Sequence, residues 1–287
     1  MLYNDYDFWR EYMKKLIIPK NFDEIEVLKP YYDGIIVGIK DLSVNVNLYL
    51  TVDDVNNLNI DREIFVALNK NMHNSDLGKL EKAMKTLKNI KGILYYDAAV
   101  VYIYNKLKPD YDLVWSQEHA TTSSVTCNYW KEKGANYTYL SADITLEEII
   151  KIRSLTDMKL IVPIFGYLPM FVSKRHLVKN YLECFDLKDE SNIHYLEKDN
   201  KMYPVLDADL TSVYSANILG SIEAYKELED NMIDYVTLNT FNIELEKMKE
   251  VLKIFANKSS NKLEELFSNL DTGFLYKETI YKVKKND

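Results

Sequence analysis

The chain has 287 residues, of which 47% are hydrophobic and 28% charged, and its formal net charge is −8. This composition excludes wholesale disorder, and the acidic balance argues against non-specific binding to polyanions, which requires cationic surface. Two cysteines, Cys127 and Cys184, are too few for a disulfide framework and fit a reducing compartment. No apolar run reaches the length of a membrane span and the first residues lack a signal-peptide pattern, so we expect a cytoplasmic protein without a membrane partner.

Short apolar, β-branched runs alternate with amphipathic stretches, a pattern typical of βα units around a parallel sheet. The runs predict eight strands, at Leu16–Ile18, Gly34–Ile39, Glu63–Leu68, Gly92–Tyr96, Asp112–Trp115, Tyr137–Ser141, Lys159–Ile164 and Ile233–Leu238. Eight strands alternating with helices predict an α/β fold of the TIM-like (β/α)8 barrel type, which need not be regular. A doubly wound open sheet fits the same alternation.

Helix-start signals stand between the predicted strands. They predict helices opened by Thr51 near 51–58, by Ser75 over 76–90, and by a capping box formed by Thr145 and Glu148. Each of these stretches is amphipathic, as a helix on the outside of a barrel should be.

One region breaks the alternation, because 174–230 is longer than a single crossover helix requires. Within it, 192–214 predicts a small β-hairpin after the seventh strand, and Ser215 is expected to cap a helix that follows. Beyond the last strand, 242–287 predicts C-terminal helices, split at 258–261, and an extended arm. We therefore expect residues 1–287 to form a single barrel-like domain.

Strong catalytic signatures are absent from the sequence, which has no P-loop, no Gly-rich dinucleotide turn, no HExxH and no nucleophile elbow. The four histidines lack metal-ligand spacing, so no metal site is predicted. Cys127 lies in a predicted helix beside Tyr129 and Trp130, with no basic neighbour in sequence. We expect it to be a buried structural cysteine and not a nucleophile.

Functional groups of a barrel gather at the C-terminal ends of its strands. The polar residues that follow predicted strands include Asn69, His73, Asp97, Glu118, His119, Thr122, Ser141, Asp143 and Asn239. Glu118 could form a proton-transfer pair with His119 or His73, and Asp97 is a further catalytic candidate. The alternative is that Asp97 caps a helix while Glu118 and Thr122 anchor a turn.

Cationic residues gather in two places, at 174–179 (Lys174, Arg175, His176 and Lys179) and in the tail (Lys277, Lys282, Lys284 and Lys285). Either group could form a local basic face on an acidic protein. Solvated surface lysines are the alternative interpretation.

Three strings resemble the collagenase-like peptidase family, the U-32 peptidases. They are TTSSVTCNYWKEKGANYTYLSADITLEEI (121–149), IVPIFGYLPMFVSKRHLVKNY (161–181) and DTGFLYKETIYKVKK (271–285). Within that family the strings are most similar to the short tRNA hydroxylation branch, which supports 5-hydroxyuridine formation at the wobble position of tRNA. The resemblance is collinear from about residue 14 and implies a barrel-like N-terminal domain.

The resemblance implies either peptidase activity or oxygen-independent hydroxylation of tRNA, ribosomal RNA or a quinone precursor, in several members through a cysteine-bound iron–sulfur cluster. For the tRNA route it implies prephenate as a co-substrate. The family's hallmark is an acid in the seventh strand, then a histidine and glycine, then a cysteine. This chain has Ile161, Phe165, Gly166 and Pro169 at those positions. Two cysteines cannot ligate a four-thiolate cluster, so we expect no cofactor in this chain.

Polar residues that the chain retains could still bind an anion or RNA, and the substrate-binding candidates are Asn69, Thr122, Asn128, Lys174, Arg175 and Lys277. Three interpretations follow. The first is a tRNA-modification protein that binds tRNA beside a longer, cysteine-containing paralogue. The second is a hydrolase, and the third is a non-catalytic scaffold or partner subunit.

Overall fold

Eight parallel strands form a closed ring at the centre of the computed structural model, which describes residues 12–117, 119–189, 191–259 and 262–277. In chain order they are β1 (Lys14–Ile18), β2 (Gly34–Ile39), β4 (Glu63–Ala67), β5 (Gly92–Tyr95), β6 (Asp112–Ser116), β7 (Tyr137–Tyr139), β8 (Lys159–Gly166) and β14 (Tyr235–Asn239). Each strand pairs with the next, and β14 pairs with both β8 and β1. The (β/α)8 barrel is confirmed, and the open sheet is wrong.

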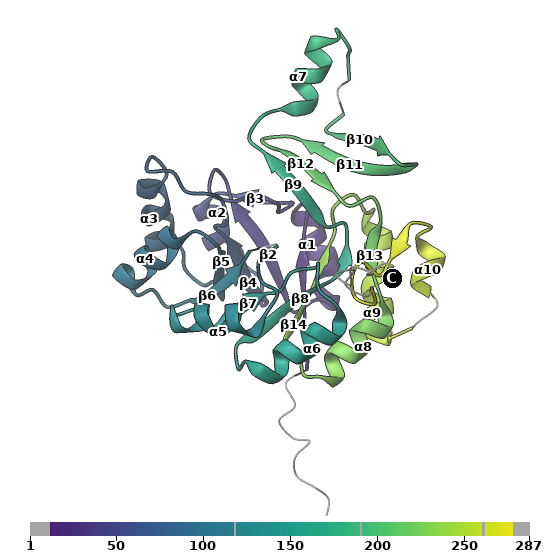
Figure 1. Cartoon of the computed structure of the whole chain (residues 1–287). Helices are drawn as coiled ribbons and strands as arrows, with labels where there is room; N and C mark the ends of the chain where they lie inside the picture. The colour runs from purple at the N-terminus through teal and green to yellow at the C-terminus, as the bar shows by residue number, and fades with distance from the viewer. Residues whose placement is uncertain (1–11, 118, 190, 260–261, 278–287) are drawn as a thin grey trace, which may run out of the picture.

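Helices cover the outside of the ring (Figure 1). They are α1 (Phe22–Leu28), α2 (Val52–Asn56), α3 (Leu77–Thr86), α4 (Ala98–Leu107), α5 (Ser124–Glu132), α6 (Leu146–Leu155), α8 (Ile222–Asp230) and α9 (Leu245–Asn257), with a short 3-10 helix η2 (Lys29–Tyr31) and a two-residue strand β3 (Tyr49–Leu50). None of the helices in the described ranges is long and apolar enough to cross a membrane.

Two of the three predicted helix starts are confirmed. The Thr51 side chain accepts a hydrogen bond from the backbone N–H of Asp54, and Thr145 accepts one from that of Glu148. Ser75 does not start its helix, because α3 begins one residue later than expected, after Asp76. The Asp76 carboxylate instead accepts the N–H of His73 and closes the preceding turn.

The barrel interior is filled unevenly along its axis. Phe65, Tyr137 and Tyr235 meet inside the ring with each pair of ring centroids 5.8 Å apart. Two of these aromatics are the first residues of their strands, so the contact closes the N-terminal end of the barrel. Two residues beyond Phe65 and Tyr235, Ala67 and Thr237 are much smaller, and this change of size on β4 and β14 leaves space at the C-terminal end.

An insertion with its own sheet stands above the barrel between β8 and α8 (Figure 1). It contains β9 (Pro169–Ser173), α7 (Leu177–Cys184), β10 (Ile193–Lys198), β11 (Lys201–Asp207) and β12 (Thr211–Tyr214), and its antiparallel strand order is β10-β11-β12-β9. The expected two-stranded hairpin over 192–214 is therefore a three-stranded unit. The additional turn lies at Asp199 and Asn200, where both residues adopt positive φ, and it was not predicted.

The helix expected after Ser215 begins later in the structure, because 218–220 forms β13 (Ile218–Gly220) along the end of β8. Ser221 caps α8 instead. After α9 the chain forms α10 (Lys262–Leu266), with the expected break between the two helices, and β15 (Leu270–Asp271), which pairs with β13. The predicted arm over 278–287 lies outside the described residues.

Gly166 ends β8 with φ +111°, and a Cβ there would stand 2.8 Å from the Asn239 Cβ and collide with the Asn239 carbonyl oxygen. We expect Gly166→Ala to lower the free energy of unfolding by about 3–5 kcal/mol, from backbone strain together with overpacking. Urea denaturation measures this. The matched control is Gly134→Ala, at φ +98° with no neighbour within 4 Å, which should cost only the strain, about 1–2 kcal/mol. Equal losses in the two variants would contradict the role of the collision.

Candidate functional site at the mouth of the barrel

A cavity of about 490 Å³ opens at the C-terminal ends of the strands. Its lining comes from the strand ends, the loops after β6, β7 and β8, the strand that returns from the insertion, and the segment after β15. Among the lining residues are Ile18, Ile36, Asn45, Ala67, Asn69, Leu94, Ser116, His119, Tyr139, Asp143, Pro163, Phe165, Met170, Asn217, Thr237, Asn239, Asp271 and Phe274. This is the end of a (β/α)8 barrel at which ligands bind.

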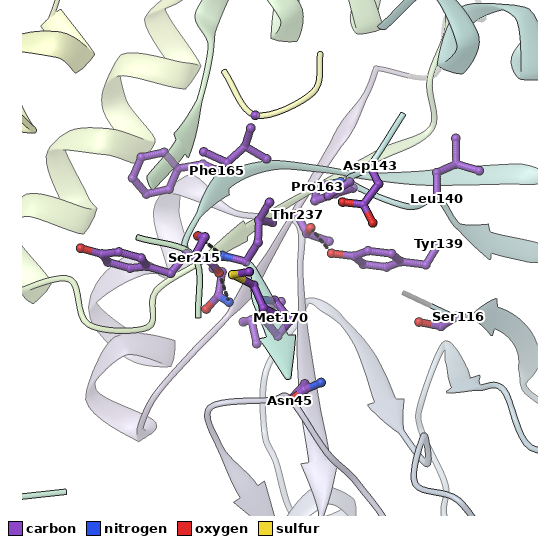
Figure 2. A pocket seen from close by; sticks show the side chains of 18 of the residues that line it. Asn45, Ser116, Tyr139, Leu140, Asp143, Pro163, Phe165, Met170, Ser215 and Thr237 are labelled. Carbon is purple, nitrogen blue, oxygen red and sulfur yellow. Dashed lines mark hydrogen bonds between the residues drawn. The ribbon is translucent and has the colours of Figure 1, made fainter. Parts of the chain in front are cut away.

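The floor of the cavity is apolar, and its polar groups are mostly uncharged. Ile18, Ile36, Ala67 and Leu94 form the floor above the aromatic contact. Across the interior, the Tyr139 hydroxyl bonds to Thr237 Oγ1 at 2.7 Å (Figure 2). An apolar cavity with a few oriented polar groups is the usual form of a small-molecule or cofactor site.

Asn239 organises the backbone around the mouth. Its Oδ1 accepts hydrogen bonds from Asn47 Nδ2 at 2.7 Å and from the Phe241 N–H at 3.0 Å, and its Nδ2 donates to the Tyr167 carbonyl at 3.0 Å. The side chain is buried, so each of these bonds satisfies a group that water does not reach. One amide therefore ties the end of β14 to the loops after β2 and β8.

Asn69 has a similar structural role on the other side of the mouth. Its Oδ1 accepts from the Val44 N–H at 2.9 Å and its Nδ2 donates to the Val44 carbonyl at 3.0 Å. These bonds hold the loop after β2, and the adjacent Asn45 sits at φ +55° on the cavity lining. Ser212 of the insertion contacts the Asn45 side chain, so the loop also supports β12.

Besides tyrosine hydroxyls, the titratable side chains that line the cavity within the described ranges are a histidine and two carboxylates. His119 Nδ1 lies 3.0 Å from Asp143 Oδ2, and Asp271 is the second carboxylate of the lining. Figure 2 shows the Asp143 carboxylate and the Tyr139 hydroxyl pointing into the same space. No lysine or arginine is among the residues found to line the cavity within the described ranges.

Two of the predicted binding residues lie at this site. Asn69 lines the cavity, and Lys277 lies at its rim. The Lys277 ammonium is 3.9 Å from Asp271 and 5.4 Å from the centre of the Phe274 ring, and both of those residues line the cavity.

Asp97 and His73 stand outside the cavity lining. Asp97 caps α4 by accepting the N–H of Ala99 at 2.8 Å, and its other oxygen accepts the N–H of Met72 at 2.9 Å. His73 is exposed on the loop before α3. The helix-cap interpretation of Asp97 is therefore the one that the structure shows.

The other predicted residues are dispersed. Asn128 joins α5 to the end of α6, donating to the Leu155 carbonyl at 3.1 Å and accepting from Thr156 Oγ1 at 2.7 Å. Thr122 is exposed at the start of α5, and neither Lys174 nor Arg175, both exposed on the insertion, lines the cavity. Glu118 lies outside the described residues. Sequence reasoning missed Asp143 as the partner of His119, because the two residues follow different strands.

The two cysteines do not fit a metal cluster. Cys127 is buried in α5, whereas Cys184 is exposed at the end of α7 in the insertion. Within the described ranges, no three His, Cys, Asp or Glu side chains come together as metal ligands. Cys127 is buried, as predicted, and this burial raises the pKa of its thiol to about 11, which disfavours the reactive thiolate.

The closed ring of strands and its outer helices define an α/β protein of the TIM-barrel class. The family model described as "Peptidase family U32" matches residues 43–194. The chain belongs to peptidase family U32, and the resemblance of its sequence strings to that family is confirmed.

Three relatives place the chain more closely. It is 30% identical to "tRNA hydroxylation protein P2" of Bacillus subtilis (strain 168), with 76% of this chain and 81% of that protein covered. It is 24% identical to "tRNA hydroxylation protein P" of Escherichia coli (strain K12), over 49% of this chain but only 31% of that protein. The solved structure of the U32 peptidase Mk0906 superposes with a TM-score of 0.50 at 12% identity, covering 83% of this chain and 96% of the other, and this likeness concerns the fold.

The positions where the family resemblance implies an acid, a histidine and a cysteine have no such chemistry here. Ile161 is buried inside the barrel. Phe165 packs against Phe255 and Phe267 at centroid distances of 6.0 and 5.7 Å, and Pro169 starts β9. These side chains anchor α9 and the insertion. Any proton transfer in the cavity must come from the other loops.

The two thiols should differ sharply in reactivity. With a pKa of about 11, only about one Cys127 in a thousand is thiolate at pH 8, and the side chain is also buried. We expect iodoacetamide at pH 8 to alkylate Cys184 and to leave Cys127 unmodified in the folded protein, as read by peptide mass spectrometry. Modification of both thiols should follow only after denaturation. Early alkylation of Cys127 would contradict its structural role.

Proposed function

We propose that this chain takes part in tRNA modification, the formation of wobble 5-hydroxyuridine, in the cytoplasm. The observation that carries the proposal is the match to "tRNA hydroxylation protein P2" over 81% of that protein. The cavity at the mouth of the barrel supports it, because it is large enough for a nucleobase and is lined mainly by apolar and uncharged polar groups.

A hydrolase is supported less well by the same site. The Cys127 thiol is buried and protonated, and the described residues contain no serine or cysteine hydrogen-bonded to His119. An activated nucleophile requires such a pair or a metal. The name of the family therefore describes this chain's ancestry better than its chemistry.

The insertion offers cations and aromatics for an RNA partner. Of the three arginines in the described ranges, Arg62 and Arg153 bond to neighbouring carbonyls and carboxylates, whereas the Arg175 guanidinium has no such partner. Lys174 beside it is also exposed, and the rings of Tyr181 on α7 and of Phe185 directly after it are 56% and 60% exposed. Cations that bind phosphates next to rings that stack on bases suit single-stranded RNA.

The chain would act with a second protein. Relatives such as "tRNA hydroxylation protein P" are longer, and this chain covers only 31% of that protein. Because two separated cysteines cannot hold a four-thiolate cluster, a longer, cysteine-containing paralogue would supply the redox centre. In this arrangement the present chain binds and presents the RNA.

Prephenate as co-substrate belongs to the same proposal. Prephenate carries two carboxylates, and a buried anion needs cations or several hydrogen-bond donors. Lys277, paired with Asp271 at the rim, is the cation placed to receive a carboxylate. A dicarboxylate would therefore bind at the rim and displace Asp271 from Lys277, while the apolar floor remains free for a ring.

Deletion of the gene tests the proposal directly. We expect total tRNA from the deletion strain to lack 5-hydroxyuridine and its derivatives, as measured by nucleoside mass spectrometry. Expression of the wild-type chain should restore them. An unchanged nucleoside profile after deletion would exclude this function.

The RNA contact can be tested separately with purified protein. We expect the double variant Lys174→Ala/Arg175→Ala to bind a tRNA anticodon stem-loop about tenfold more weakly at low salt, with a shallower dependence of affinity on salt, because phosphate contacts are lost. The matched control is Lys82→Ala/Lys85→Ala, which removes two exposed cations from α3 on the outside of the barrel. Equal losses in the two double variants would mean that the binding is non-specific and does not involve the insertion.

A further inference from the structure

His119 and Asp143 approach one another at the rim of the cavity from two different loops. His119 follows β6 and Asp143 follows β7, and 3.0 Å separates Nδ1 from Oδ2. Both residues line the cavity. We propose that they form a proton-transfer pair, in which His119 is the catalytic residue that touches the ligand and Asp143 is the positioning residue.

The backbone around the pair is fixed by hydrogen bonds. Gln117 Oε1 accepts the N–H of His119 at 2.9 Å, and the Asp143 N–H donates to Ser141 Oγ at 3.1 Å. The two loops are joined to each other, because the Ser141 N–H donates to the Thr121 carbonyl at 3.0 Å. The relative placement of the two side chains is therefore set by the fold before any ligand binds, as catalytic groups require.

Two other histidine–aspartate contacts in the described ranges differ from this pair in their position relative to the cavity lining. His194 lies 3.2 Å from Asp189, and His176 lies 3.6 Å from Asp207, both within the insertion. Neither of those pairs lines the cavity. An exposed ion pair contributes little to stability, so stability alone does not account for a pair fixed at the mouth of a barrel.

The geometry assigns a role to each ring nitrogen of His119. With Asp143 accepting the Nδ1–H, the neutral imidazole carries its free lone pair on Nε2. Nε2 takes one proton from an N–H or O–H of the ligand, which leaves the ligand with the bonding electron pair, and the imidazolium returns the same proton in a later step. The histidine therefore ends the cycle unchanged.

The charges around the cavity favour this transfer. The carboxylates of Asp143 and Asp271 face the cavity, Lys277 pairs with Asp271, and Tyr139 is the nearest titratable group on β7. Glu118, which precedes His119, lies outside the described residues. The described lining contains no lysine or arginine, and Lys277 at the rim pairs with Asp271, so the Asp143 carboxylate is the charged group that the positive charge developing on His119 meets directly.

The pair deepens the proposed function, on which it rests: the ligand is a nucleobase whose ring N–H reaches the mouth. In the deletion strain, His119→Asn should restore less than a tenth of the 5-hydroxyuridine that the wild-type chain restores, since general acid–base catalysis contributes about 10²–10⁴-fold. Asp143→Asn should restore an intermediate amount, and Asp143→Glu, which keeps the carboxylate, should recover most of it. His194→Asn and Asp189→Asn are matched controls and should restore the wild-type level.

Two measurements on purified protein separate catalysis from folding and binding. The thermal midpoint of His119→Asn and its affinity for the anticodon stem-loop should both stay at wild-type values. If His119→Asn restores wild-type levels of 5-hydroxyuridine, the proton-transfer pair is wrong. It is also wrong if His119→Asn lowers the affinity for the anticodon stem-loop by as large a factor as it lowers the amount of 5-hydroxyuridine. If wild-type protein itself restores no nucleoside, it is the proposed tRNA function that fails, and the pair fails with it.

Discussion

Closure of the barrel by β14 is the constraint on which the rest of the structure depends. This strand pairs with β1 along one edge and with β8 along the other, so it fixes the strand ends at which the loops begin. Asn239, its last residue, bonds to the backbone of Tyr167 and Phe241 and to the side chain of Asn47. Its backbone lies so close to β8 that only glycine fits at position 166. The site therefore depends on strand pairing as much as on its own side chains.

The cavity exists because side-chain size changes along the strands. Phe65 and Tyr235 fill one end of the ring, and Ala67 and Thr237, two residues later, leave the other end open. The aromatic contact stabilises the closed ring without occupying the mouth. Phe165 stands where the family resemblance implies a histidine, and it packs against Phe255 and Phe267 in a second aromatic cluster under α9. The loop after β8, the seventh strand of the ring, is structural, whereas the loops after β6 and β7, the fifth and sixth strands, hold the polar pair.

Much of the barrel could be predicted from sequence, because strands buried on both faces are uniformly apolar and stand out between amphipathic helices. The eight predicted strands are the eight strands of the ring. Pairwise contacts between loops were not predictable in the same way: His119 was matched to its sequence neighbour Glu118, whereas Asp143 comes from the next loop. Asn128 lies in one of the family-like strings, and the sequence does not show that its side chain bonds α5 to the end of α6.

The insertion leaves and re-enters the barrel at a single point. The Leu168 N–H donates to Ser215 Oγ at 3.0 Å, and the Ser215 N–H donates to the Leu168 carbonyl at 2.8 Å, so a short clasp joins the two ends. Beyond it, Tyr214 stacks on Phe241 with centroids 3.7 Å apart and seats the module on the mouth. Because the two ends are joined at one point, the segment from β9 to β12 can become longer or shorter, or be replaced, during evolution while every strand of the ring stays the same. Relatives can therefore differ in the partner that the insertion binds while the cavity at the mouth of the barrel stays the same.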